Sequence, residues 1–246
     1  MRLQEVLRTE GFRGVITRVA RKAQTAVLRC ERVAFYEYDL TQPAPRLRPP
    51  SIEIEFIVAM PDDLLRIHRA TLEADFDIGP QEVRQRLAHS HVALLALHDG
   101  EVIAMLWLAF NSQKVSEVGM QMVLRSGEVL TYNECTLAAW RGHGVSPHLN
   151  QFAHSFAVLH GACRRINWRR RGNAPAIRVA NKLGDRLFAV VTTVRVLGVQ
   201  HVLALGTHTA QLLQLLHPIT EEAARVSDPR KMGHTKLDRR RTGIGV

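Results

Sequence analysis

The sequence predicts an α/β (α+β) fold in which a mixed, mostly antiparallel sheet is flanked by helices. After residue 50, segments of period two and period 3.6 follow in the order β-α-α-β-β-(β)-β-α-β-α-β-β. A hairpin signal, His98-Asp99-Gly100, joins two apolar runs and favours antiparallel neighbours. Late in the chain two amphipathic helices connect strands as crossovers, so we expect both strand directions in one sheet.

Length and charge limit the class of protein. The 246 residues suffice for one good-sized domain with extensions, or for two small domains. The formal charge of +10 favours an anionic partner such as nucleic acid, an acidic membrane surface or a phosphate-bearing cofactor, and a solvated basic surface is the alternative. The three cysteines are far apart without metal or redox spacing, so we expect a reducing, cytoplasmic setting and no metal.

The two ends of the chain differ from its middle. Residues 1–31 predict a basic amphipathic helix, which can contact an anionic membrane peripherally or pack on its own domain or a partner chain. The prolines of residues 42–50 exclude helix and central strand, which indicates a linker. We therefore expect an N-terminal extension over 1–50, a main domain over 51–206, and a C-terminal helix with a basic, disordered tail over 207–246.

Within the main domain, hydrophobic periodicity assigns each element in turn. Pro80 and Pro61 open helices, and Asn173 is the expected N-cap of a third. The polar segment 111–118 receives no element, and Met120 to Leu124 is an additional strand or a lining loop. The expected strands are Ile52–Val58, His91–Leu97, Glu101–Phe110, Glu128–Thr136, Cys163–Trp168, Leu187–Val196 and Val199–Leu205, and the helices are Pro61–Glu73, Pro80–His89, Val145–Leu159 and Asn173–Gly184.

The stretch from Glu128 to Gly184 contains the strongest functional signal. A strand leads into the turn Arg141-Gly142-His143-Gly144-Val145-Ser146, and an amphipathic helix with Pro147 in its first turn follows. Glycines allow backbone N–H groups to approach a phosphate, and a helix N-terminus favours negative charge. A plain strand-to-helix turn is the alternative reading of the same residues.

The sequence resembles the GNAT superfamily of acyl-CoA-dependent N-acetyltransferases over roughly residues 51–205. The family motif is Arg or Gln, two free positions, Gly, one free position, then Gly or Ala, and Arg141 to Ser146 matches it with serine at the last position. The family's downstream asparagine, alanine and Lys-Leu-Gly are matched by Asn173, Ala176 and Lys182-Leu183-Gly184. Two departures are Ala180, where many members have a tyrosine proposed as general acid, and Asp185, where an aromatic residue is common.

The resemblance implies a GNAT-like sheet whose central strands splay to admit acetyl-CoA, the acyl donor, without a metal. It implies that the strand before the turn lies along pantetheine and that the turn binds the CoA pyrophosphate. The cofactor-binding residues it implies are Thr136, Leu137, Arg141, Gly142, His143, Gly144, Val145, Ser146 and Asn173. The implied acceptor is the amine of a small molecule, sugar or peptide, and neither its identity nor the oligomeric state follows from the sequence.

Glu134 is the candidate general base, acting directly or through water. A free alkyl amine has a pKa near 10.4, so removing its proton at pH 7 costs roughly 4–5 kcal/mol. The alternative is a carboxylate that pairs with an arginine or orients the acceptor. His143, His148 and His154 are expected to be solvated residues on the helix and turn surface.

A second hypothesis is a non-catalytic GNAT-fold scaffold whose basic N-terminal helix and arginine tail engage a membrane or nucleic acid. The segment Arg164–Arg171 places five arginines around Trp168. It could hold the CoA 3′-phosphate, an anionic acceptor or RNA, or point its charges to solvent. We do not expect nucleic acid as the main partner.

Overall fold

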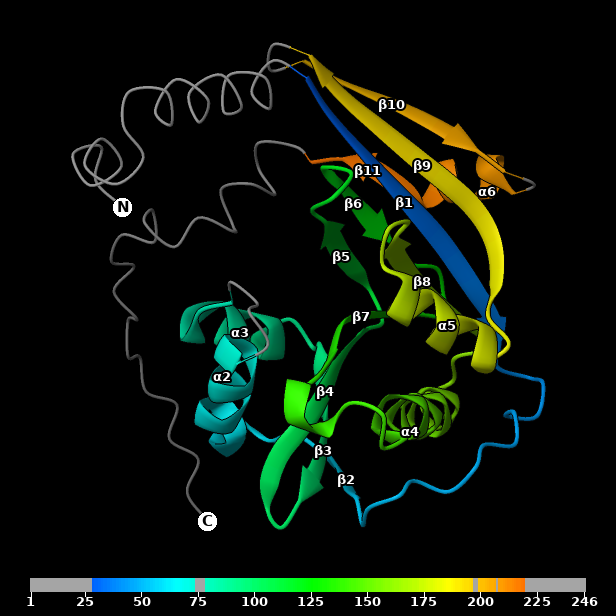
Figure 1. Cartoon of the computed structure of the whole chain (residues 1–246). Helices are drawn as coiled ribbons and strands as arrows, with labels where there is room; N and C mark the ends of the chain where they lie inside the picture. Colours follow the sequence, from blue (N-terminus) through cyan, green and yellow to red (C-terminus); the bar gives the residue numbers. More distant parts are fainter. Residues whose placement is uncertain (1–27, 74–77, 197–198, 207, 220–246) are drawn as a thin grey trace, which may run out of the picture.

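The structure is a computed structural model that describes residues 28–73, 78–196, 199–206 and 208–219. Its centre is an eight-stranded sheet in the order β10-β9-β1-β8-β7-β4-β3-β2 (Figure 1). Among these described strands β7 and β8 run parallel, and the other neighbours run antiparallel. The strands are β1 (Leu28–Asp39), β2 (Glu55–Val58), β3 (Val92–His98), β4 (Glu101–Ala109), β7 (Glu128–Thr136), β8 (Arg164–Arg170), β9 (Arg186–Val196) and β10 (Val199–Leu205).

Helices cover both faces of this sheet (Figure 1). One face packs against α2, α3, α6 and a small second sheet in the order β11-β6-β5, and the other packs against α4, with α5 over β1. The predicted fold class, a mixed and mostly antiparallel sheet flanked by helices, is therefore confirmed. The remaining elements are η1 (Pro61–Asp63), α2 (Leu64–Glu73), α3 (Pro80–Ala88), β5 (Ser112–Val115), β6 (Met120–Val123), η2 (Ala138–Trp140), α4 (Val145–Leu159), α5 (Ala174–Lys182), α6 (Thr209–Leu215) and β11 (Leu216–Pro218).

Strand β1 corrects the prediction for the N-terminal part of the chain. Residues 28–31 were expected to end a helix, but they begin a strand that lies between β8 and β9. Val33 and Phe35 are buried on one face of this strand and Ala34 and Tyr36 on the other. With both faces buried, the strand shows no polar alternation, and its pattern cannot be separated from a helix. The expected boundary at residue 51 leaves out a central strand of the sheet.

Other differences from the predicted elements are small. The polar segment after Asn111 contains β5, which pairs with β6, so Met120 to Val123 is a strand and not a loop. Strand β2 begins at Glu55, and residues 52–54 lie outside it. Residues 1–27 of the helix predicted over 1–31, and residues 220–246 of the helix and tail predicted over 207–246, lie outside the described residues. Within the part of the chain that the structure describes, no helix is long and apolar enough to cross a membrane.

Most arginines of β8 are buried or half-buried. This differs from the alternative in which the Arg164–Arg171 segment points its charges to solvent. Arg165 is fully buried, as is the Asp185 side chain with which it forms an ion pair. Arg165 also donates through Nη1 to Asn150 Oδ1 at 2.7 Å, and Asn167 donates to the second oxygen of Asp185 at 3.0 Å. Burial lowers the pKa of Arg165, and Asp185 opposes that shift. Arg164, one residue earlier, pairs with Glu37 and Glu128 on the two flanking strands.

Replacing Asp185 with asparagine should strongly destabilise the fold. Asp185→Asn leaves the buried Arg165 charge without its counter-ion, and removing one partner of such a pair costs about 3–5 kcal/mol. Urea unfolding measures the loss. The control is Glu73→Gln, since Glu73 pairs with Arg69 at the surface and should cost less than about 1 kcal/mol. Equal losses in the two variants would contradict the role given to Asp185.

Candidate functional site

The candidate site lies where β7 and β8 stop pairing, and the divergence of these two strands is called the cleft below. The two strands pair from Glu128 opposite Arg164 to Thr131 opposite Asn167, and beyond this point both continue without pairing to each other. On its other side β7 contains a β-bulge, because Met105 of β4 faces Cys135 while Trp107 faces Tyr132. Bulges next to an unpaired strand end redirect backbone and side chains. The divergence and the bulge together leave part of β7 free of both neighbours.

Asn133 lies in this bulge with φ of 45°, in the left-handed region. Asparagine tolerates that region better than most residues, which is consistent with its presence here. The strand register assigns no β4 partner to Asn133 or Glu134. The bulge was not predicted from the sequence, and the local signal for it was the asparagine within the predicted strand.

Glu134 lies at the centre of a hydrogen-bonded cluster in the cleft. Its Oε1 accepts from the Ser146 hydroxyl and from Asn150 Nδ2, the latter at 2.8 Å. Its Oε2 accepts from Arg169 Nη2 at 3.3 Å, so an ion pair joins the separated strands. The Glu134 side chain is 14% exposed and that of Arg169 8%. Glu134 therefore has the arginine pairing that was its alternative role, and Ser146 directs its hydroxyl to this carboxylate.

The predicted phosphate turn has the backbone geometry that its glycines permit. Gly142 and Gly144 have φ of 90° and 82°, and Gly144 is the N-cap of α4. Arg141 Nε donates to the Thr136 carbonyl at 3.1 Å, which ties the turn to the end of β7. The His148 ring contacts the Gly144 carbonyl at 2.8 Å. The turn thus presents the N-terminal end of α4, as an anion-binding turn requires.

The proline-rich segment upstream braces this turn and does not act as a free linker. The Ser51 N–H donates to the His143 carbonyl at 3.1 Å, and the Ser51 hydroxyl contacts His143 Nδ1 at 2.8 Å. A Cβ placed on Gly144 would come within 3.3 Å of Pro50 Cα, and Gln151 donates to the Pro45 carbonyl. In Figure 1 the segment runs from the end of β1 around α4 to β2.

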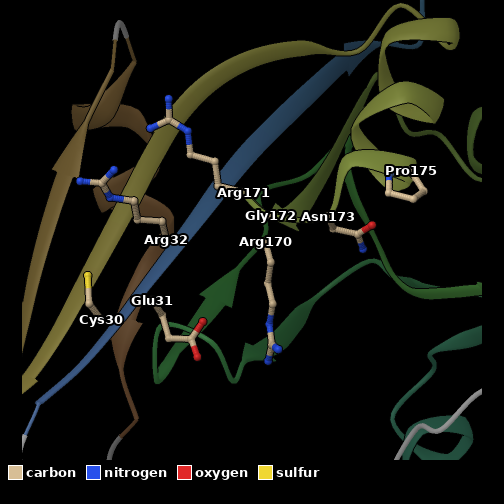
Figure 2. A pocket seen from close by; sticks show the side chains of 8 residues that line it. All are labelled: Cys30, Glu31, Arg32, Arg170, Arg171, Gly172, Asn173 and Pro175. Atoms are coloured by element: carbon tan, nitrogen blue, oxygen red, sulfur yellow. The ribbon is translucent and has the colours of Figure 1, made fainter. Parts of the chain in front are cut away.

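The other predicted cofactor residues do not gather at one site. The Leu137 N–H donates to the Ile103 carbonyl, and the Leu137 carbonyl accepts from the Trp140 N–H, so both backbone groups of Leu137 already have hydrogen-bond partners. The Thr136 hydroxyl oxygen is buried without a hydrogen-bond partner. Val145 is the first residue of α4, and its side chain is buried in the core between α4 and the sheet. Asn173 caps α5 through the Ala176 N–H and lies at a separate surface depression (Figure 2).

The three histidines expected to be solvated are less exposed than predicted. His143 and His148 are half-buried, and His154 is only 4% exposed and stacks on Tyr38 with ring centroids 4.7 Å apart. It lies on the side of α4 that faces the sheet, and burial lowers its pKa to about 3. A second buried histidine, His91, contacts the Tyr132 hydroxyl at 2.6 Å beside the bulge, with its pKa lowered by burial to about 4. Both rings are therefore neutral at pH 7.

The two departures from the family pattern have structural explanations. Ala180 is fully buried against Ala34 and Tyr36, so no α5 side chain offers a proton at this position. Asp185 is the counter-ion of Arg165. In the described ranges there is no group of three or more His, Cys, Asp or Glu side chains arranged to hold a metal ion.

Comparisons with known proteins agree with this geometry. The family model described as "Acetyltransferase (GNAT) family" matches residues 61–185, just over half of the chain. A GCN5-related N-acetyltransferase from Sphaerobacter thermophilus has a similar fold, with TM-score 0.50, 18% identity, and 74% of this chain and 56% of that chain covered. A tandem GNAT protein from the clavulanic acid biosynthesis pathway gives TM-score 0.50, 14% identity, and coverage of 74% and 59%. The match spans less than two thirds of either solved chain, and a search of curated proteins found no significant match.

Gly144 should tolerate alanine less well than Gly142. Both have positive φ, which costs a residue with a Cβ about 1–2 kcal/mol. At Gly142 a Cβ meets no atom within 4 Å, whereas at Gly144 it meets the Pro50 backbone, which must move. We expect Gly144→Ala to lower the free energy of unfolding by more than Gly142→Ala, measured in urea. A larger loss for Gly142→Ala would show that Pro50 does not press on the turn.

Proposed function

This chain belongs to the acetyltransferase (GNAT) family, and on that basis we propose that it transfers an acetyl group from acetyl-CoA to a primary amine. The observation that supports this most directly is the coincidence of the family match with the cleft between β7 and β8. The amine attacks the thioester in a ternary complex of enzyme, donor and acceptor. The acceptor class is a small molecule, sugar or peptide, and the proposed setting is cytoplasmic.

The residues present fit acetyl-CoA in two respects. The Arg141–Ser146 turn has open space at Gly142, where a Cβ would meet nothing within 4 Å, and it ends at the N-terminus of α4. Backbone N–H groups there can bind the pyrophosphate, and the helix dipole adds about 0.3–1 kcal/mol. In the bulge, Asn133 and Glu134 have no β4 partner in the strand register, and we propose that their backbone N–H groups polarise the thioester carbonyl. Acetyl-CoA supplies the activated acyl group.

Direct attack is favoured over an acyl-cysteine intermediate. Cys135 follows Glu134 in β7 and is the cysteine nearest the cleft in sequence. Burial raises the pKa of its thiol to about 12, so it carries no thiolate at neutral pH. Glu134 is the proposed general base. Ser146 and Asn150 bond to Oε1 and Arg169 to Oε2, so a fourth acceptor position of the carboxylate, on Oε2, is left for the amine proton.

Incubation of the purified protein with acetyl-CoA and a panel of amines tests the proposal. We expect acetyl-CoA to raise the thermal unfolding temperature, and acetyl transfer to at least one amine to release free CoA. Arg141→Ala should weaken CoA binding, because the turn loses its bond to the Thr136 carbonyl. Absence of any thermal shift at millimolar acetyl-CoA would refute the proposal.

Glu134→Gln separates a general base from a structural carboxylate. If Glu134 accepts the amine proton, kcat should fall about 10²–10⁴-fold and the acidic limb of the pH profile should disappear. The control is Glu128→Gln, which removes a carboxylate from the paired end of the same strand and should keep the pH profile. A profile that Glu134→Gln leaves unchanged, together with lower stability, would assign Glu134 to holding β7, β8 and α4 together.

A second candidate is a GNAT-fold binding or scaffold protein without catalysis. Two features favour it. The Glu134–Arg169 ion pair lies across the cleft, and the buried Ala180 stands where a side chain could have acted as general acid. CoA binding without turnover across the amine panel, combined with salt-sensitive binding to anionic liposomes or RNA, would support this candidate over the enzyme.

A further inference from the structure

A surface depression lies where β8 ends while its neighbour β1 continues. The last backbone bond between them runs from the Arg171 N–H to the Arg32 carbonyl at 3.0 Å. Beyond it the β1 backbone has no β8 partner, and an open hollow of about 840 Å³ remains. Figure 2 shows the residues that line it: Cys30, Glu31, Arg32, Arg170, Arg171, Gly172, Asn173 and Pro175. This hollow is distinct from the phosphate turn, which follows β7.

The lining of the depression has an excess of positive charge. Arg32 of β1 lies opposite Arg171, the residue directly after β8, and Figure 2 shows both side chains projecting to the same side of the sheet. Both are exposed, and neither forms an ion pair with any carboxylate of the described residues. Arg170 projects to the other side, where its Nε lies 3.8 Å from a Glu117 oxygen.

This arrangement differs from that of the other β8 arginines. Arg164, Arg165 and Arg169 each have a carboxylate within 3.3 Å. Like charges directly opposite each other across antiparallel strands are destabilising, so an uncompensated Arg32–Arg171 pair weakens the sheet end. Planar guanidinium groups bind carboxylate and phosphate oxygens in bidentate fashion, and a bound anion would remove the repulsion.

The depression is continuous in sequence with the candidate site. Arg169 of β8 contacts Glu134 in the cleft. Arg171 lies two residues further along the chain, directly after the end of β8. Asn173 and the first turn of α5 complete the same hollow. We propose that this depression binds the carboxylate or phosphate group of an anionic acyl acceptor, with Arg32 and Arg171 as its ligands. The identification of the ligand as an acyl acceptor rests on the proposed acetyl transfer, whereas the anion site itself does not depend on it.

Binding of inorganic phosphate tests the anion site without any turnover. Phosphate is titrated at constant ionic strength into the full chain, Arg32→Gln/Arg171→Gln and Arg178→Gln, with affinity measured by calorimetry. Arg178 is an exposed α5 arginine outside the lining, so Arg178→Gln controls for the loss of one of the two positive charges at a surface position. We expect the double variant to lose at least about tenfold in affinity and Arg178→Gln to lose less than twofold. Equal losses in both would leave only a solvated basic surface and overturn the site.

A kinetic comparison then identifies the source of the anion. Amines that differ by one anionic group, such as ethanolamine and phosphoethanolamine or propylamine and β-alanine, are compared as acceptors. The double variant should raise KM about tenfold or more for the anionic member alone and leave kcat and the KM for acetyl-CoA unchanged. Weaker binding of CoA with unchanged binding of dephospho-CoA would instead assign the arginines to the donor's 3′-phosphate. If no amine is acetylated, the proposed function fails while the phosphate titration still decides the anion site.

Discussion

The rest of the structure depends on compensation of one charge, the guanidinium of Arg165 in the middle of the sheet. It has no exposed surface, so its hydration must be replaced by protein groups. Asp185, in the connection from α5 to β9, supplies the negative charge, and Asn150 of α4 supplies an oxygen. Because these partners come from α4 and from the residues just after α5, satisfying this charge fixes where both helices lie over the sheet.

Asn150 connects this requirement to the cleft. The same side chain that accepts from Arg165 donates to Glu134, so a continuous polar path runs from Asp185 to the carboxylate on β7. Glu134 in turn holds Ser146 in the first turn of α4 and Arg169 across the opening. The interactions that stabilise the fold and those that shape the cleft are therefore the same network. This explains why a polar cluster of this size persists inside a sheet that is otherwise packed by apolar side chains.

Local sequence patterns predicted most elements after residue 60, with β5 and β11 as exceptions, because period, caps and glycines act within a few residues of each other. The Asn173 cap and the strand–turn–helix around Gly144 were found this way. Strand β1 was missed because its two buried faces show no alternation. The contacts of Arg165 with Asn150 and Asp185 were missed because the partners lie up to 20 residues apart, and the arginine that pairs with Glu134 was left open because Arg169 lies 35 residues away. His91 and Tyr132 lie still further apart, and neither residue type alone predicts the other. Pairing across space was the information that a single sequence did not contain.

The central place of β1 has a consequence for synthesis on the ribosome. Asp39 pairs with Arg164, so the polypeptide must grow by 125 residues after β1 before its first partner strand exists. At about 5–20 residues per second this interval is roughly 6–25 seconds. During that time Val33, Phe35 and Tyr36, which are buried in the folded chain, have no strand to cover them. Nascent chains therefore pass through a period in which a hydrophobic segment near the N-terminus is open to chaperones or to other nascent chains, and closure of this long-range pairing is expected to be a late event in folding.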